Sequence, residues 1–404
     1  MSETVSLGEI DPARSRHAGR RSAVTLTADS ITVGTATGAV RAFDRHTLEP
    51  TWTAESDSDG TAVVSAETVG DCLVVGERGP AGLIRAYDLE TGTPRWQYRT
   101  ADDLGNPRKE TRFFLPFVVD IEASGERFYV AARRYERDDG ARSFESVVYA
   151  FDPDGEVIWR YETDASPISL DVQDSRVAVA YNRCPGEHQQ GLVVLDSVTG
   201  TEQFAWDPGT DGQRRVGDVS LFDAAVVVSS HGDYRGYRLD SDGTVDWCVD
   251  LATPQETGGE TLYAYPNHVA ANEDAVAFIT GNTYAVERRE TDSLHPDEHT
   301  VFGYTLSGER RWTDHIGGFA SGVERDGNRL AIPSAQHFRQ RDPDLHGFSV
   351  FDIRTGERTL SETDGVVTVT ALVDETAAAI EEPVSYHDDG QTRGTYRLHV
   401  DSGL

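Results

Sequence analysis

The sequence predicts an all-β protein: a single eight-bladed β-propeller of four-stranded antiparallel blades. Two observations predict it. A turn motif, clearest between Tyr87 and Trp96, recurs at intervals of roughly 45 residues along the whole chain. Each copy also contains short β-branched runs separated by turn residues, which is the pattern of successive antiparallel strands. A four-stranded unit cannot bury both faces alone, so a row of such units is expected to pack radially and close into a disc.

The repeated turn has a local mechanism. An acidic residue at its start can accept backbone N–H bonds, and a glycine such as Gly92, Gly200 or Gly356 supplies a positive φ. The turn starts at Asp44, Asp88, Asp152, Asp196, Asp240, Thr305, Asp352 and Asp401. A large residue follows most copies, namely Trp52, Trp96, Trp159, Trp206, Trp247 and Trp312, with Leu360 in the seventh.

The repeats leave little of the chain outside one domain, which we place at residues 1–404. Residues 23–404 hold the eight copies, and the last copy ends before its fourth strand. Residues 4–10 alternate through Val5, Leu7 and Ile10, so they are predicted to supply that missing strand. Residues 11–22 form a polar connection.

The Asp-x-x-Thr-Gly-x-x-x-Trp turn, with Ala-Tyr or Ala-Phe before the Asp, resembles the repeat of pyrroloquinoline-quinone-type (quinoprotein-like) propellers. The resemblance implies that each turn Trp packs against the neighbouring blade. It also implies that enzymatic members hold a quinone at the axis, with calcium, a catalytic Asp and often a disulfide of adjacent cysteines. This chain has no Cys-Cys pair and no haem Cys-x-x-Cys-His motif. We therefore expect no cofactor and no catalytic residue.

The net charge of the chain restricts the classes of partner that it can bind. The chain carries 69 acidic and 37 basic residues, a formal net charge of −32, and its only lysine is Lys109. Nucleic acid is disfavoured because a phosphate backbone needs a basic footprint. An excess of acids with almost no lysine is typical of proteins from salt-accumulating extreme halophiles, where molar salt screens self-repulsion.

The number of cysteines and the N-terminal sequence indicate the cellular compartment of the protein. Cys72, Cys184 and Cys248 are odd in number and lie in different repeats, so we expect reduced thiols in a cytoplasmic protein. Arg20-Arg21 suggests a twin-arginine signal, but polar residues interrupt any following apolar stretch. We expect no membrane anchor and a monomer.

Three motifs resemble metal sites. Asp152 with Asp154, and Asp240 with Asp242, fall on the repeated turn and lack the rest of a calcium loop. His295 and His299 have the four-residue spacing of two helical zinc ligands. Pro296 and the absence of a third ligand favour an exposed, solvated loop, so no metal site is predicted.

A basic region interrupts the acidic chain: nine basic residues lie between Arg99 and Arg142 against nine acids, with aromatic residues interleaved. Two interpretations stay open, an insertion neutralised by its own Arg–Asp pairs and a contact site for an acidic or peptide partner.

Strand order puts the long connections of an antiparallel blade on the face opposite the short repeated turns, and binding residues concentrate on such connections. The predicted contact residues are Arg112, Arg133, Arg134, Tyr135 and Arg137, with His295, His299 and His337 as weaker candidates. The expected function is a non-catalytic binding or assembly platform for a protein or small ligand, similar to the family's scaffold members such as the outer-membrane assembly lipoprotein. The alternatives are a quinone- or sugar-linked oxidoreductase and a sensor domain.

Overall fold

The structure is a computed structural model that describes residues 2–14, 20–56, 61–109, 114, 117–335, 342–386 and 390–403. It divides into two compact units: a first unit, Arg21–Val219, and a second unit, Met1–Arg20 with Ser220–Leu404. We describe each unit by itself. The single domain over residues 1–404 stays a prediction.

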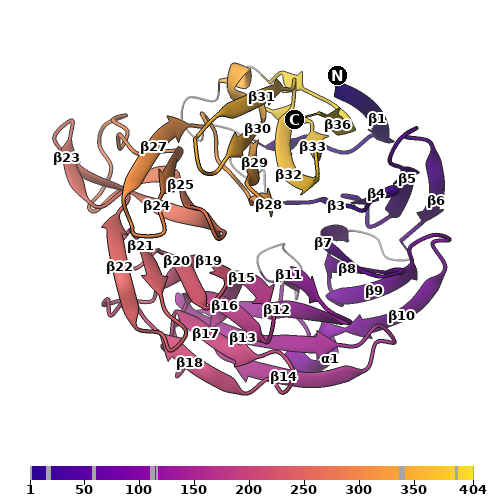
Figure 1. Cartoon of the computed structure of the whole chain (residues 1–404), viewed down its shortest axis with the longest axis horizontal. Coiled ribbons are helices and arrows are strands. Elements are labelled where there is room, and N and C mark those ends of the chain that lie inside the picture. Colours follow the sequence, from indigo (N-terminus) through magenta and orange to yellow (C-terminus); the bar gives the residue numbers. More distant parts are fainter. Residues whose placement is uncertain are drawn as a thin grey trace. The chain divides into compact units, whose positions relative to one another are not determined.

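The first unit is built of antiparallel four-strand sets that follow one another along the chain (Figure 1). The sets are β3 (Ala23–Leu26), β4 (Ser30–Gly34), β5 (Val40–Asp44) and β6 (Pro50–Ala54); β7 (Ala62–Val69), β8 (Cys72–Arg78), β9 (Leu83–Asp88) and β10 (Pro94–Arg99); β11 (Phe117–Ser124), β12 (Arg127–Asp138), β13 (Ala141–Phe151) and β14 (Val157–Thr163); and β15 (Ser166–Gln173), β16 (Arg176–Arg183), β17 (Leu192–Asp196) and β18 (Glu202–Trp206). A short helix, α1 (Thr100–Leu104), follows β10.

The second unit continues the pattern. Its sets are β19 (Val216–Phe222), in which the chain passes between the units, with β20 (Ala225–Ser230), β21 (Arg235–Leu239) and β22 (Val245–Asp250); β23 (Gln255–Thr257), β24 (Glu260–Ala271), β25 (Val276–Ala285), β26 (Thr300–Tyr304) and β27 (Arg310–His315); β28 (Glu324–Asp326), β29 (Arg329–Ser334), β30 (Gly347–Asp352) and β31 (Arg358–Glu362); and β32 (Val366–Val373), β33 (Thr376–Glu382), β36 (Tyr396–Ser402) and β1 (Ser2–Gly8). A small sheet joins β2 (Ala13–Arg14), β34 (Val384–Ser385) and β35 (Thr392–Arg393), and η1 (Pro343–Leu345) precedes β30.

The N-terminal strand completes the last set, as predicted. β1 pairs antiparallel with β36, from Ser2 opposite Asp401 to Gly8 opposite Tyr396. The strand begins and ends two residues earlier than the predicted 4–10. Leu7 is its buried side chain, with 2% of its surface exposed. The all-β, propeller-type architecture is confirmed.

The repeated turns have the predicted hydrogen bonds. The Asp88 carboxylate accepts the Thr91 N–H at 2.9 Å and the Thr91 hydroxyl at 2.8 Å. The Arg95 guanidinium and these Thr91 donors hold the pKa of Asp88 at about 2. Thr305 replaces Asp in one copy, and its Oγ1 accepts the N–H of Glu309 at 3.0 Å. The Asp152 carboxylate likewise accepts backbone N–H groups of its turn. The segment that resembles a calcium loop is therefore one of the repeated turns.

Tryptophans join neighbouring sets as the family resemblance implies. The indole N–H of five of these tryptophans donates to a carbonyl in the next repeated turn, at 2.8–3.0 Å. The pairs are Trp52 with Leu89, Trp96 with Pro153, Trp159 with Ser197, Trp247 with Leu306 and Trp312 with Ile353. Leu360, which replaces Trp in the seventh copy, is 49% exposed.

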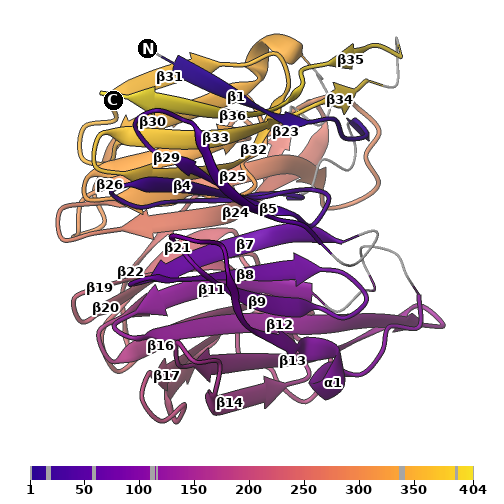
Figure 2. The ribbon, with the colours of Figure 1, turned by 90° about the vertical axis from the view of Figure 1, so that its right-hand side faces the viewer.

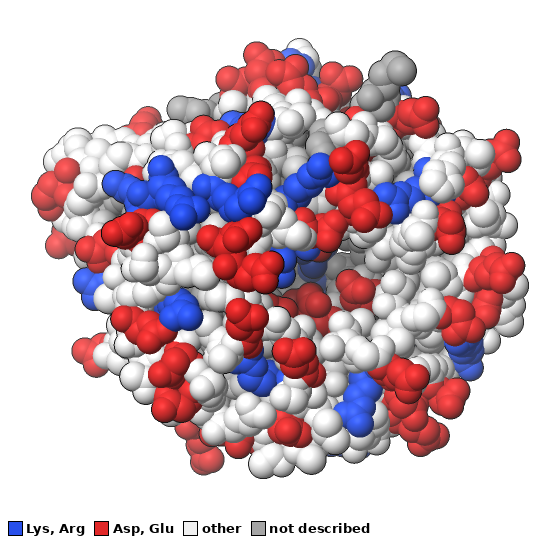
Figure 3. All heavy atoms as spheres, viewed as in Figure 1, with Lys and Arg blue, Asp and Glu red and all other residues white. Residues whose placement is uncertain are grey.

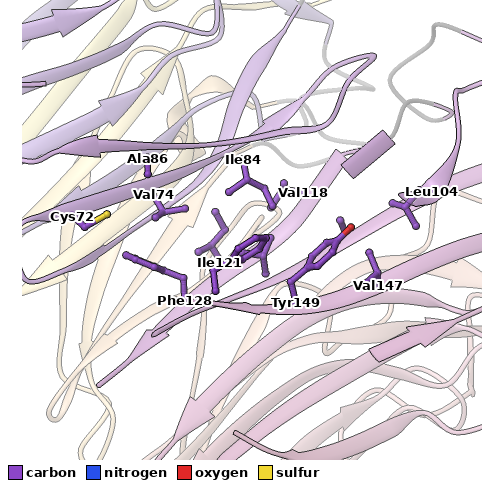
Figure 4. Packing of buried hydrophobic residues seen from close by; sticks show 13 residues of the cluster. Cys72, Val74, Ile84, Ala86, Leu104, Val118, Ile121, Phe128, Val147 and Tyr149 are labelled. Carbon is purple, nitrogen blue, oxygen red and sulfur yellow. The ribbon is translucent and has the colours of Figure 1, made fainter. Parts of the chain in front are cut away.

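The apolar core lies between consecutive sets rather than within one. In the cluster drawn in Figure 4, Val74 and Ile84 of one set face Val118, Ile121 and other residues of the next. Hydrophobic burial therefore couples these two sets of the first unit.

Acidic residues are spread over the face drawn in Figure 3, with basic residues in shorter groups among them. Cys72, Cys184 and Cys248 are free thiols. Within the described residues, no helix has the length and apolar character needed to cross a membrane.

Candidate binding site

The predicted contact residues lie on a long hairpin of the first unit. β12 has 12 residues and β13 has 11, whereas β8 has 7 and β16 has 8. Figure 2 shows β12 extending farther than β8 and β9 of the preceding set. These contact residues were expected on a long connection between strands, which was wrong. The ladder continues to Asp138 opposite Ala141, and the polar sequence there reflects a strand that extends beyond the core.

Strand alternation divides the predicted residues between two faces. One face carries Arg133, Tyr135 and Arg137, and the pairs across the ladder add Phe144 and Arg142 to it. Arg134 points to the other face, opposite Glu145. The contact residues predicted from the sequence therefore do not form one surface.

Aromatic rings cover the middle of the first face. Tyr135 stacks on Phe144 with ring centroids 5.1 Å apart and on Phe114 at 5.0 Å. The Lys109 ammonium lies 4.9 Å from the centre of the Phe114 ring. Phe144 is buried, whereas Tyr135 and Phe114 stay partly exposed. The stack thus presents rigid, partly apolar surface on a hydrogen-bonded ladder.

Arg137 and Arg142 stand directly opposite each other near the hairpin end. Like charges at directly opposed strand positions repel each other and destabilise the pair. Arg137 is exposed and Arg142 half-exposed. Within the described part of the chain, neither forms an ion pair.

The other face of the hairpin is neutralised internally. The Arg134 guanidinium bonds Glu136 at 3.1 Å and Glu145 at 2.7 Å. Glu136 also accepts the backbone N–H of Arg108 at 3.1 Å. On this face the basic residues are neutralised by acidic residues of the same region, which was the first of the two interpretations. The face that bears Arg137 fits the second interpretation, a contact site for a partner.

Arg133 lies at the base of the hairpin and turns inward. Its Nη1 donates to Ser166 Oγ and, at 3.3 Å, to the Pro167 carbonyl. Its guanidinium lies 4.8 Å from the centre of the Phe117 ring. Burial, and then the neighbouring guanidiniums of Arg78 and Arg183, lower the pKa of Arg133 to about 10.

The two candidate histidines of the second unit are buried, so the expectation of a solvated loop was wrong. His295 and His299 are each 2% exposed. His295 Nε2 lies 3.1 Å from the Thr253 carbonyl, and burial lowers its pKa. His299 Nε2 lies 2.9 Å from Asn282 Oδ1. The segment before β26 packs back onto β24 and β25, which its charged sequence did not indicate.

Metal-binding geometry is absent from the described residues, where no three His, Cys, Asp or Glu side chains converge. Two predicted contact residues, Arg112 and His337, lie outside the part of the chain that the structure describes.

Sequence analysis missed a tyrosine cluster in the second unit. Tyr263 and Tyr265 come from β24 and Tyr284 from β25, with centroid separations of 5.2–5.8 Å. Tyr234 packs on Tyr263 at 4.5 Å and has a φ of 65°, a conformation that bulky residues rarely adopt. Aromatic residues at alternating positions 263 and 265 were the signal available in the sequence.

Comparison with known proteins supports one family. The sequence profile described as outer membrane protein assembly factor BamB matches residues 14–138 and 143–359. No curated protein matches the sequence.

Among solved structures, BamB from Moraxella catarrhalis is 15% identical with a TM-score of 0.58, over 98% of this chain and 99% of that one. A quinohaemoprotein alcohol dehydrogenase from Pseudomonas putida is 10% identical with a TM-score of 0.60, over 98% and 77%. A computationally designed protein, Ika8, is 13% identical with a TM-score of 0.60, over 97% and 98%. At these identities the similarity establishes the fold alone.

Proposed function

This chain belongs to the family of the outer membrane protein assembly factor BamB, and we propose that it is a non-catalytic binding platform for an acidic protein partner. The family name describes an assembly role, which is compatible with a scaffold. The contact surface that we propose is the hairpin face made of Tyr135, Arg137, Arg142, Phe144 and Phe114; we call it the hairpin face.

One observation carries this proposal: Arg137 opposes Arg142 on an exposed ladder beside a stack of aromatic rings. A carboxylate supplied by a partner would bridge the two guanidiniums and remove their repulsion. The rings supply large contact area on a rigid support, and aromatic residues with arginine dominate the energetics of protein interfaces.

The test compares the whole chain with a double variant, Arg137→Ser with Arg142→Ser. Proteins retained by the immobilised wild type in the source lysate are identified, and each is then titrated singly against both forms. We expect the variant to bind the true partner at least about tenfold more weakly, since charged hydrogen bonds are worth about 1.5–3 kcal/mol. Its melting temperature should not fall, because the change removes like-charge repulsion.

A matched control removes two arginines from outer strands of the same unit, Arg99→Ser with Arg160→Ser. It changes net charge by the same amount and leaves the hairpin face intact. Equal affinity of the wild type and the hairpin variant for every retained protein would overturn the proposal.

The same proposal includes the cellular compartment and the cofactor. Three free thiols, two of them buried, fit a reducing cytoplasm.

We propose that no cofactor is bound, whereas the similarity to dehydrogenase structures favours the alternative of a quinone-linked oxidoreductase. Purified chain supplied with pyrroloquinoline quinone and calcium should show no dye-linked oxidation of alcohols or sugars. Turnover that disappears on chelation would favour the alternative.

A further inference from the structure

Three arginines occupy corresponding positions in consecutive sets of the first unit. Arg78 and Arg183 are the last residues of the second strands of their sets, β8 and β16, whereas Arg133 lies within the longer second strand β12. Each of the three lies opposite the first residue of the preceding strand. Phe117 pairs with both Arg78 and Arg133 in the ladder. Arg78, Phe117 and Arg133 pair directly across one sheet, so their side chains project to the same side of it. Arg183, on the next sheet, extends this row through its pairing with Ser166.

Stacking fixes the first two guanidiniums of the row. The Arg78 and Arg133 guanidinium carbons lie 5.3 Å and 4.8 Å from the centre of the Phe117 ring. The row then continues through Ser166, whose hydroxyl holds Arg133 and whose backbone pairs with Arg183. All three arginines are half-buried.

The central cation has only neutral partners. Within the described residues, Arg133 bonds the Ser166 hydroxyl and the Pro167 carbonyl, and its buried Nε has no acceptor. The charges that act on it most are the two other guanidiniums. A half-buried cation surrounded by other cations is costly unless an anion compensates its charge. This chain has 69 acidic residues, yet none of those described forms an ion pair with Arg133.

We propose that Arg78, Arg133 and Arg183 form an oxyanion-binding site for a small ligand that bears at least two negative charges. The planar guanidinium presents paired N–H donors that match carboxylate and phosphate oxygens, and several guanidiniums on one ligand favour a multivalent anion. Phe117 and Ser166 hold the donors in place before binding. The site goes beyond the proposed platform function, because it requires no protein partner and excludes Arg137 and Arg142.

The test titrates the whole chain with citrate and, separately, with pyrophosphate by calorimetry at constant ionic strength in phosphate-free buffer. We expect binding of one or both, weakening as KCl is raised, since a screened charge attraction drives it. Citrate alone would identify a carboxylate ligand, and pyrophosphate alone a phosphate ligand. Binding of neither probe would overturn the proposal.

Arg133→Met keeps side-chain bulk over Phe117 and removes the charge. It is expected to weaken binding by at least about tenfold, the loss of a charge-assisted pair. The matched control is Arg127→Met, on the same strand, whose Nη1 likewise donates to a backbone carbonyl, that of Ser197, at 2.8 Å. Equal weakening by both changes would contradict the site.

Two further variants keep the test decisive if Arg133→Met does not fold. Arg183→Met should reproduce the loss of binding. Arg137→Ser with Arg142→Ser should leave probe binding unchanged, so failure of the oxyanion site and failure of the platform function can be told apart. Loss of probe binding in the hairpin variant, with none in Arg183→Met, would overturn the assignment.

Discussion

The glycines of four repeated turns meet two separate requirements. Gly92 has a φ of 69°, and a β-carbon added to it would lie 2.5 Å from the Trp52 indole. Gly155, Gly200 and Gly356 have the same relation to Trp96, Trp159 and Trp312. The positive φ could be predicted from the turn type, whereas the close approach of the indole could not.

Gly92→Ala should therefore destabilise the protein by about 3 kcal/mol, because it adds overlap with Trp52 to the cost of a left-handed backbone. Gly209 is the matched control, with a φ of 73° and no atom within 4 Å of the added carbon. Gly209→Ala should cost only about 1 kcal/mol. Chemical denaturation of both variants measures the difference, and equal losses would show that the indole can move aside.

Glu67 gives the first unit a pH dependence. Burial raises the pKa of Glu67 to about 7, and the nearby charge of Asp120 on β11 also raises it. The Thr68 N–H, which donates to the Glu67 carboxylate at 3.1 Å, lowers the pKa. Between pH 4.5 and about 7 the folded state keeps a proton that the unfolded state has lost. Stability therefore falls as pH rises through this window and levels off above it.

Glu67→Gln should remove that dependence. At pH of about 8 the variant should be more stable than the wild type by about 1–2 kcal/mol, allowing for the partial exposure of the side chain, and the difference should vanish near pH 4. Denaturation midpoints across this pH range measure it. The exposed Glu126→Gln serves as control, and a variant whose profile parallels the wild type would refute the role of Glu67.

At the scale of elements, β1 supplies the outer strand of the last set. Without it, β36 would present unpaired backbone groups along a free edge, which favours association with other chains. A chain lacking residues 2–8 should aggregate more readily and melt at a lower temperature. Light scattering and thermal unfolding measure both effects.

A peptide with the sequence of residues 2–9 should restore the truncated chain by adding a strand to β36. The control peptide carries Val5→Asp and Leu7→Asp, since Leu7 is buried in the intact chain. Rescue by both peptides, or by neither, would argue against pairing through this strand.

Elements with periodic apolar residues were predictable, and those without them were not. The last copy was expected to supply all but one strand of its set, and it supplies β32, β33 and β36. The outer part of the β12–β13 hairpin carries mostly polar residues, so no burial signal marked it as strand. The buried segment around His295 was missed for the same reason, because its partners include Thr253 and Gln255, which lie 42 and 40 residues earlier in the chain.

At the scale of the molecule, a net charge of −32 makes stability depend on salt. Raising ionic strength from 0.1 M to 1 M shortens the Debye length from about 10 Å to about 3 Å, which reduces self-repulsion. The melting temperature should rise with KCl between about 0.1 M and about 2 M. Sucrose, which carries no charge, is the control for general exclusion effects. A flat response to KCl would contradict the halophilic interpretation.

The sequence by itself determined the repeat, the four-strand grammar, the turn chemistry from Asp88 to Gly92 and the completion of the last set by the N-terminus. These depend on local backbone geometry and on alternation along the chain, both of which are properties of short segments. Only the tertiary structure decided which arginines act together. Strand register placed Arg78 beside Arg133 and turned Arg134 to the opposite face. Packing of the next sheet brought Arg183 to the same row through Ser166. Charge and composition cannot show this, because neighbours across a ladder are set by long-range pairing.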